Sequence, residues 1–412
     1  MTAIQVHVAI DGQDVLAGTL YASRRRNTES AAFAYESSFL AHPGAYALDP
    51  LLPLTRGTHQ TRAGLALFGG FSDCAPDRWG RTLMKRREAA LARAEGRAAR
   101  SLGEIEFLLG VRDDLRQGAL RFRKEDGPFL ADTDTGVPAL TDLPSLLDLA
   151  ERAERDTADL PDLQRLVHVG SSLGGARPKA HVLGANGRVA IAKFPSANDS
   201  TWTVTAWEKV ALDLAASAGI TVPESRLLNL AGRHVLVVDR FDRTADGRRI
   251  GYSSAMTMLE ASDGDQRSYL EIADVLERVS TRATAELHQL WRRIVFSVLI
   301  SNTDDHLRNH GFLHERGDSW RLSPAFDLNP NPDPGPKYLS TAIDDGYDAA
   351  SVEVALGVAE LLRLAPTDAR NVLAEVVNAV RQWRTIAAGH GLSASEIGRM
   401  QPAFVALDEV AV

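Results

Sequence analysis

The sequence predicts an α+β fold in which β-rich segments come first and helical segments follow. Residues 4–22 alternate between apolar and polar positions on both sides of an Asp-Gly pair, a typical hairpin turn. Two further strand pairs are expected at residues 179–193 and 224–243, where Asn-Gly and Ala-Gly supply the turns. From Asp239 onward, apolar residues recur mostly at helical spacing, which predicts helices for the rest of the chain.

At 412 residues the chain is longer than a single compact core. We expect a small N-terminal module of strands and helices at residues 1–130, a β-rich lobe at 131–238 and an all-helical lobe at 239–412. In the module, a long helix rich in Ala, Leu and Arg should start after Pro76 and Asp77.

The β-rich lobe begins with a helical stretch at residues 140–165, which Pro144 and Pro161 interrupt. The following VHVG, residues 167–170, reads as a strand that leads into a loop of small residues. The strand pair after this loop ends at Lys193.

A short polar segment, SNTDDHLRNHGF at residues 301–312, follows an apolar helical run at 290–300. A polar segment that leaves a buried helix is a candidate active-site loop. Asp304 could accept a hydroxyl proton, while Asn309 and the later Asp327 could hold Mg²⁺. This is the set of groups that phosphoryl transfer uses in protein kinases.

The order of elements favours the same interpretation. A glycine-containing loop between strands, followed by Lys193, matches the upper lobe of a kinase, where backbone amides and an ammonium group bind phosphates. Glu208, early in the next helix, could pair with Lys193. Each feature alone has an ordinary structural explanation, since glycine-rich hairpins and acidic helix surfaces are common. Together they predict a two-lobed, protein-kinase-like fold.

Composition restricts the class of protein further. The formal net charge of −8 argues against a surface built mainly for nucleic acid, and the basic stretches at 24–26 and 81–100 read better as solvated faces. Cys74 is the only cysteine, which excludes an intrachain disulfide and a cysteine-based zinc site. The sequence has neither an apolar run of membrane-spanning length nor a basic leader, so we expect a cytoplasmic protein without membrane contact.

The linked motifs SSLGGARPKA, AIAKFP, VVDRFDR, NTDDHLRN and AFDLNP, after FGGFSDCAPDRWGR and GALRF, resemble the HipA family of bacterial serine/threonine kinase toxins. The resemblance spans nearly the whole chain. It implies that Asp304 is the catalytic base and that Asn309 and Asp327 hold Mg²⁺, with Asp327 in the place of the DFG aspartate of other kinases. Asp305 adjoins Asp304 where many relatives have a small residue, so it is a second candidate for the base.

The resemblance also implies an ATP site. The backbone of Asp239 and Phe241 would meet the adenine, and Glu208 would support the phosphate-binding Lys193. The phosphate loop and the lysine near it would comprise Leu173, Gly174, Gly175, Ala176, Arg177 and Lys179.

Family members regulate themselves by phosphorylating a loop serine, which corresponds here to Ser172 or to its neighbour Ser171. A phosphate there would repel the phosphates of ATP and drive the loop from the site. The resemblance further implies a small helix-turn-helix antitoxin, HipB, which holds the kinase and makes most contacts to operator DNA. Characterised relatives phosphorylate aminoacyl-tRNA synthetases, which stops translation and produces dormancy and persistence.

Two alternatives remain open. His306, His310 and His314 recur every four residues and could bind a metal in a hydrolase if they shared a helix, although Gly311 and Phe312 interrupt the segment. Alternatively, the kinase fold could be catalytically silent and act as a binding module or co-repressor together with its antitoxin. A serine hydrolase is not supported, because the sequence has no G-x-S-x-G motif.

Overall fold

The computed structural model describes residues 2–25, 28–125, 127–131, 136–170, 175–184, 186–197, 199 and 202–410. The chain forms two compact units, each discontinuous in sequence. The first comprises Met1–Asn198, Asp239–Ser253 and Leu313–Asp318, and the second Asp199–Val238, Ser254–Phe312 and Ser319–Val412. The three-part division at residues 130 and 238 stays a prediction.

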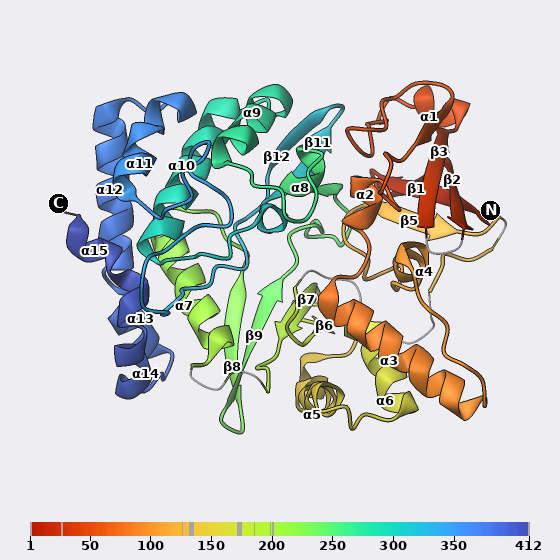
Figure 1. The fold of residues 1–412 in the computed structure, drawn as a ribbon, viewed down its shortest axis with the longest axis horizontal. Helices are drawn as coiled ribbons and strands as arrows, with labels where there is room; N and C mark the ends of the chain where they lie inside the picture. The colour runs from red at the N-terminus through yellow and green to blue at the C-terminus, as the bar shows by residue number, and fades with distance from the viewer. Residues whose placement is uncertain are drawn as a thin grey trace. The chain divides into compact units, whose positions relative to one another are not determined.

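The first unit contains a five-stranded sheet with the order β4-β3-β2-β1-β5 (Figure 1). Asp11 and Gly12 both have positive φ, 49° and 82°, as a type I′ turn requires, which confirms the predicted hairpin. Alternation along β1 places Ile4, Val6 and Val8 in the core. The strands are β1 (Thr2–Ile10), β2 (Gln13–Arg25), β3 (Thr28–Tyr35), β4 (Thr58–Gln60) and β5 (Leu120–Arg123).

Helices complete the first unit, and one of them corrects a prediction. The stretch VHVG, expected to be a strand, forms the last turn of α6, because Leu163, Leu166, Val167 and Gly170 are buried at helical spacing against α3. The helical stretch predicted at 140–165 is divided into separate helices, and Pro144 and Pro161 are each the second residue of one of them, where proline is tolerated. The helices are α1 (Ser37–Leu40), α2 (Gly69–Ser72), α3 (Arg78–Ala94), α4 (Glu104–Leu109), η1 (Leu140–Asp142), α5 (Leu143–Glu154) and α6 (Leu160–Gly170).

Two hairpins form around the turns predicted from the sequence. In the first unit, β6 (Lys179–Leu183) pairs antiparallel with β7 (Val189–Lys193), and Lys179 lies opposite Lys193. In the second unit, β8 (Ser225–Leu230) pairs with β9 (Arg233–Asp239).

The second unit is built around α10 (Ala283–Leu299), which packs against α9 (Tyr269–Val279) and α12 (Pro366–Val380) (Figure 1). Trp291 and Phe296 of α10 are completely buried. The remaining helices are α7 (Val204–Ser217), α8 (Ala255–Met258), η2 (Leu307–Asn309), α11 (Val352–Gly357), η3 (Ala359–Leu362), α13 (Trp383–Gly389), α14 (Ala394–Arg399), η4 (Gln401–Phe404) and α15 (Ala406–Glu409).

The part after Asp239 is not all-helical, in contrast to the prediction. It also contains three short strands, β10 (Tyr252–Ser254), β11 (Gly311–Arg316) and β12 (Ser319–Leu322). Gly317, whose φ is 54°, lies between β11 and β12, and burial alternates along β12, where Trp320 and Leu322 are buried. Within the described ranges, no helix combines the length and apolar character needed to span a bilayer.

Candidate active site

The polar loop 301–312 begins where α10 ends, and a Schellman turn sets its direction. Ser301 adopts a left-handed conformation with a φ of 51°, which is uncommon outside glycine. Its N–H donates to the carbonyl of Val298 at 3.2 Å, and the N–H of Asn302 donates to the carbonyl of Ser297 at 2.8 Å. The helix end therefore fixes the direction in which the loop leaves the buried core.

The two adjacent aspartates of this loop have different surroundings. Asp305 is buried, and its carboxylate accepts hydrogen bonds from the hydroxyls of Tyr269 and Ser297, while Nε2 of His310 lies 3.2 Å from it. Burial alone would raise the pKa of Asp305, but His310 and the two hydroxyls hold it below its ordinary value. The carboxylate of Asp305 is therefore held by neighbouring side chains inside the protein.

Asp304, in contrast, is exposed. Partial desolvation raises the pKa of its carboxyl group, the nearby charge of His306 lowers it, and the negative charges of Asp327 and Asp305 add to the rise, which leaves the pKa above its ordinary value. A raised pKa makes a carboxylate a better proton acceptor. The accessibility of the two side chains favours Asp304 over Asp305 as the base.

Asn309 and Asp327 offer the oxygen atoms expected of a magnesium site. The side-chain Nδ2 of Asn309 donates to the backbone carbonyl of Asp304 at 3.2 Å, which leaves the amide oxygen as a possible metal ligand. Asp327 is held in a left-handed conformation with a φ of 58° and influences the pKa of Asp304 through its charge. A carboxylate and an amide oxygen are hard ligands, so this donor set fits Mg²⁺.

The segment after Asp327 runs along the polar loop. The N–H of Asn329 donates to Oδ1 of Asn302 at 3.2 Å, and Nδ2 of Asn329 donates to the carbonyl of Asp327 at 3.1 Å. Asn331 reaches the loop twice, through its N–H to the carbonyl of Ser301 and through Nδ2 to the hydroxyl of Thr303. The candidate base and the candidate metal ligand are thus parts of one hydrogen-bonded assembly in the second unit.

Part of the predicted phosphate loop belongs to the first unit. Gly175 has a φ of +103°, and a Cβ there would lie 2.7 Å from Nζ of the buried Lys179. Trp79, in the first turn of α3, donates its N–H to the carbonyl of Gly175 at 3.3 Å and its indole N–H to the carbonyl of Lys179 at 3.2 Å. The sequence analysis did not identify Trp79 as a site residue, although it lies in the quoted DRWGR motif.

Four other predicted residues of this loop, Ser171, Ser172, Leu173 and Gly174, lie outside the described residues. Among the described ones, Ala176 is exposed and Arg177 is half-buried. Lys193 ends β7 in the first unit, whereas Glu208 is buried on α7 in the second. The ion pair between them stays a prediction.

The VVDRFDR motif has a structural role that the sequence analysis missed. Asp242 is buried and accepts hydrogen bonds from Arg240, from Arg243 and from the N–H of Gly118 at 2.8 Å. The two arginines also donate to the carbonyl of Arg116, at 3.1 and 2.8 Å. The side chains of the motif therefore fasten it to residues 114–118. The alternation of acids and arginines was the available sequence signal.

The predicted adenine contacts lie at the start of the same motif. The carboxylate of Asp239 accepts a hydrogen bond from Asn186 at 3.1 Å, and Phe241 is half-buried beside Tyr252. His181 adds a link to the motif, since its Nε2 lies 3.1 Å from a guanidinium nitrogen of Arg240 and its Nδ1 lies 2.9 Å from the carbonyl of Val169. Burial and the charge of Arg240 hold the pKa of His181 well below its ordinary value, so the ring is neutral at pH 7.

Two of the three histidines considered as metal ligands contact other side chains. His310 contacts Asp305, and the ring of His314 stacks on Tyr46, with ring centroids 3.8 Å apart. Across the residues that the structure describes, no group of three or more His, Cys, Asp or Glu side chains could hold a metal ion. The positions of these side chains give no support to a histidine-based metal hydrolase.

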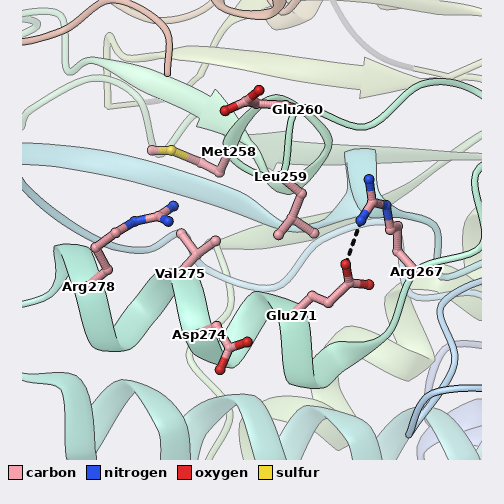
Figure 2. A pocket seen from close by; sticks show the side chains of 8 residues that line it. All are labelled: Met258, Leu259, Glu260, Arg267, Glu271, Asp274, Val275 and Arg278. Atoms are coloured by element: carbon pink, nitrogen blue, oxygen red, sulfur yellow. Dashed lines mark hydrogen bonds and ion pairs between the residues drawn. The ribbon is translucent and has the colours of Figure 1, made fainter. Parts of the chain in front are cut away.

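A separate cavity of about 260 Å³ lies in the second unit between the end of α8 and α9 (Figure 2). Figure 2 shows Arg267 paired with Glu271 at its edge, with a nitrogen–oxygen distance of 2.6 Å. The cavity is lined by Met258, Leu259, Glu260, Arg267, Glu271, Asp274, Val275 and Arg278. None of the predicted site residues is among them.

The fold and the polar loop define a kinase-like α+β protein. Residues 171–384 match the family model of the HipA-like C-terminal domain, which is more than half of the chain, and the protein therefore belongs to this family. HipA of Shewanella oneidensis MR-1, solved in a complex with HipB and operator DNA, superimposes with a TM-score of 0.63 and 16% identity. The alignment covers 98% of this chain and 95% of that one.

Curated relatives carry kinase names. Two proteins of Sinorhizobium fredii, "Putative kinase Y4dM" and "Putative kinase Y4mE", are 31% identical over 152 residues and 26% identical over 224 residues. These alignments cover 34% and 48% of this chain. The chain spans only 36% and 48% of the length of these two relatives, so the likeness is partial.

Proposed function

We propose that the protein is an ATP-dependent serine/threonine protein kinase with Asp304 as the catalytic base. The observation that carries this proposal is the difference between Asp304 and Asp305: the first is exposed with a raised pKa, while the second is buried and fixed by three side chains. An accessible carboxylate on an anchored loop can accept the proton of a substrate hydroxyl.

Asn309 and Asp327 would hold Mg²⁺, and the bound ion would neutralise charge on the phosphates of ATP. The bond from Nδ2 of Asn309 to the carbonyl of Asp304 supports this role, because it ties the candidate ligand to the backbone of the candidate base. Positioning and electrostatic stabilisation supply most of the catalysis in phosphoryl transfer, so a rigid link between the two suits the reaction.

The other contacts to ATP would come from the residues that the family resemblance assigns to them. Lys193, supported by Glu208, and Lys179 would bind phosphates together with the loop 173–177, and the backbone of Asp239 and Phe241 would meet the adenine. The buried position of Lys179 beside Gly175 and the bonds from Trp79 support a preformed end of this loop.

Regulation and partners follow from the family. Ser172, or Ser171, would be phosphorylated by the protein itself. A HipB-like helix-turn-helix antitoxin would bind the kinase and contact operator DNA, which agrees with the presence of HipA, HipB and operator DNA in the Shewanella complex. The substrate would be a protein serine or threonine, by family resemblance that of an aminoacyl-tRNA synthetase, and its modification would stop translation.

Incubation of the purified protein with ATP and Mg²⁺, followed by intact and peptide mass spectrometry, tests the proposal. We expect one added phosphate that maps to Ser172 or Ser171, with Asp304→Asn as the inactive control. Failure of the wild-type protein to gain phosphate while nucleotide still binds would contradict the proposal and favour a silent binding module. The starting mass separates this outcome from a protein that was already phosphorylated.

A further inference from the structure

The backbone on both sides of Asp304 is held by one distant stretch of chain, Ser340 and Thr341. The carbonyl of Thr303 accepts two hydrogen bonds from Ser340, one from its N–H at 3.0 Å and one from its hydroxyl at 2.8 Å. The carbonyl of Asp305 accepts the hydroxyl of Thr341 at 2.6 Å. Asp304 therefore lies between two fastened peptide groups.

This stretch is itself fixed from its other side. The N–H of Ala342 donates to the carbonyl of Arg267 at 2.9 Å, and the N–H of Tyr269 donates to the carbonyl of Ala342 at 2.9 Å. Tyr269 also donates its hydroxyl to the carboxylate of Asp305. Hydrogen bonds thus join three segments of the second unit: the start of α9, the stretch 340–342 and the polar loop.

We infer that Thr341 is a positioning residue for Asp304: its hydroxyl holds the carbonyl of Asp305, the residue next to the candidate base, so that the Asp304 carboxylate keeps one orientation toward the substrate hydroxyl. Thr341 is completely buried and would touch neither substrate nor nucleotide. The inference rests on the proposed kinase function. It goes beyond that function because it assigns a residue 37 positions away from the base, outside the motifs quoted above for the family resemblance.

The physical argument compares the two side chains that fit this position. Valine has nearly the shape of threonine but lacks the donor, so Thr341→Val would leave the buried carbonyl of Asp305 without this hydrogen bond. The loop would then be free to shift, and a displacement of about 1 Å at a catalytic group can cost on the order of 100-fold in rate. Thr341→Ser keeps the hydroxyl and removes only a methyl group.

The chain offers a matched control in the same unit. Thr205 is also buried, and its hydroxyl donates to a backbone carbonyl, that of His234, at 2.8 Å. Thr205→Val therefore removes the same chemical interaction away from the polar loop. A general loss of stability would affect both valine variants, whereas a positioning role would affect only Thr341→Val.

Two measurements on the full chain separate the inference from the proposed function. The first is hydrogen exchange of peptides that cover residues 301–309, without nucleotide, where the amides of His306 and Asn309 donate within the loop. We expect faster exchange in Thr341→Val and wild-type exchange in Thr341→Ser and Thr205→Val. The second is the rate of self-phosphorylation at saturating ATP, which should fall by about 10-fold to 100-fold in Thr341→Val alone, with an unchanged KM for ATP.

The outcomes are distinguishable. If the wild-type protein transfers phosphate and Asp304→Asn does not, but Thr341→Val matches the wild type in exchange and rate, the inference is overturned and the kinase function stands. Equal changes in Thr205→Val would also overturn it. If Thr341→Val does not fold, Ser340→Ala replaces it, because that variant removes one of two bonds to the carbonyl of Thr303 and should show a smaller change in the same direction. Absence of any phosphate transfer by the wild type would overturn the proposed function itself. Hydrogen exchange of residues 301–309 would then show only whether Thr341 anchors the loop.

Discussion

The segment 239–243 of the VVDRFDR motif, in the first unit, and the polar loop of the second are both short and rich in charge, yet the protein uses them differently. In the motif, Arg240, Asp242 and Arg243 are buried and bind one another and the carbonyls of residues 114–118. In the loop, Asp305 is buried in the same way, but the adjacent Asp304 is exposed.

The difference teaches that charge density alone does not identify a catalytic segment. A buried ion pair that is fully hydrogen-bonded holds parts of the chain together, and its members are not available to a substrate. A catalytic group needs anchored neighbours and its own accessibility. The polar loop provides both within two consecutive residues, and four predictions test this contrast.

The largest effect is expected from Asp304→Asn. Because the side chain is exposed, the thermal unfolding temperature should stay at the wild-type value, while loss of the proton acceptor should slow phosphoryl transfer by about 10²-fold to 10⁴-fold. Asp305→Asn is the comparison variant, since it weakens the bonds from Tyr269, Ser297 and His310 and should lower the unfolding temperature. Self-phosphorylation rates and calorimetry would check both. A stable, active Asp304→Asn variant would contradict the assignment of the base.

The second prediction concerns the scaffold. Asp242→Ala leaves the buried Arg240 and Arg243 without their carboxylate and should lower the free energy of unfolding by about 3–5 kcal/mol. Asp246→Ala is the control, because Asp246 is exposed and pairs with the exposed Arg248, two positions further along the chain, so its loss should leave the free energy of unfolding close to the wild-type value. Urea titration at pH 7 measures both. Equal values for the two variants would show that the buried cluster contributes little to stability.

Local patterns predicted local structure well. The Asp-Gly hairpin, the strand that ends at Lys193 and the helix before the polar loop depend on neighbouring residues, and the structure confirms them. The strand predicted for VHVG was wrong, because so short a segment fits a strand and a helix end equally, and only the contact with α3 decides between them. Tyr269 and Thr341 were missed, since each meets Asp305 from 36 positions away and no periodicity reports such a contact. The roles assigned to Asp304, Asn309 and Asp327 stay predictions.

A third, smaller effect is the pH dependence of the scaffold. Burial alone would raise the pKa of Asp242, but the charges of Arg240 and Arg243 hold it well below its ordinary value of about 3.9. A carboxyl group with a lowered pKa in the folded state stabilises the protein above its unfolded pKa, and this contribution is lost as the pH falls below about 3.9. The difference in unfolding free energy between the wild type and Asp242→Asn should therefore be constant between neutral pH and about pH 5 and shrink in more acidic buffer. A difference that grows on acidification would contradict this sign.

The smallest effect is expected for the alkylation rate of Cys74, a thiol next to the same cluster. The backbone carbonyl of Cys74 accepts a hydrogen bond at 3.2 Å from the buried Arg116, which links Cys74 to this cluster. Cys74 is itself buried, and burial raises the pKa of its thiol to about 12. Only the thiolate reacts with iodoacetamide, so the folded protein should resist alkylation at pH 8 while the urea-unfolded chain reacts completely. Asp242→Ala should accelerate alkylation of the folded protein, since it loosens the arginines that bind the carbonyl of Arg116. Asp304→Asn should leave the alkylation rate unchanged, because the polar loop belongs to the other unit. Mass spectrometry measures the alkylation rate of Cys74 in each variant. An equal increase in Asp242→Ala and Asp304→Asn would mean that the buried motif and the exposed loop are not independent, and would contradict the contrast drawn between them.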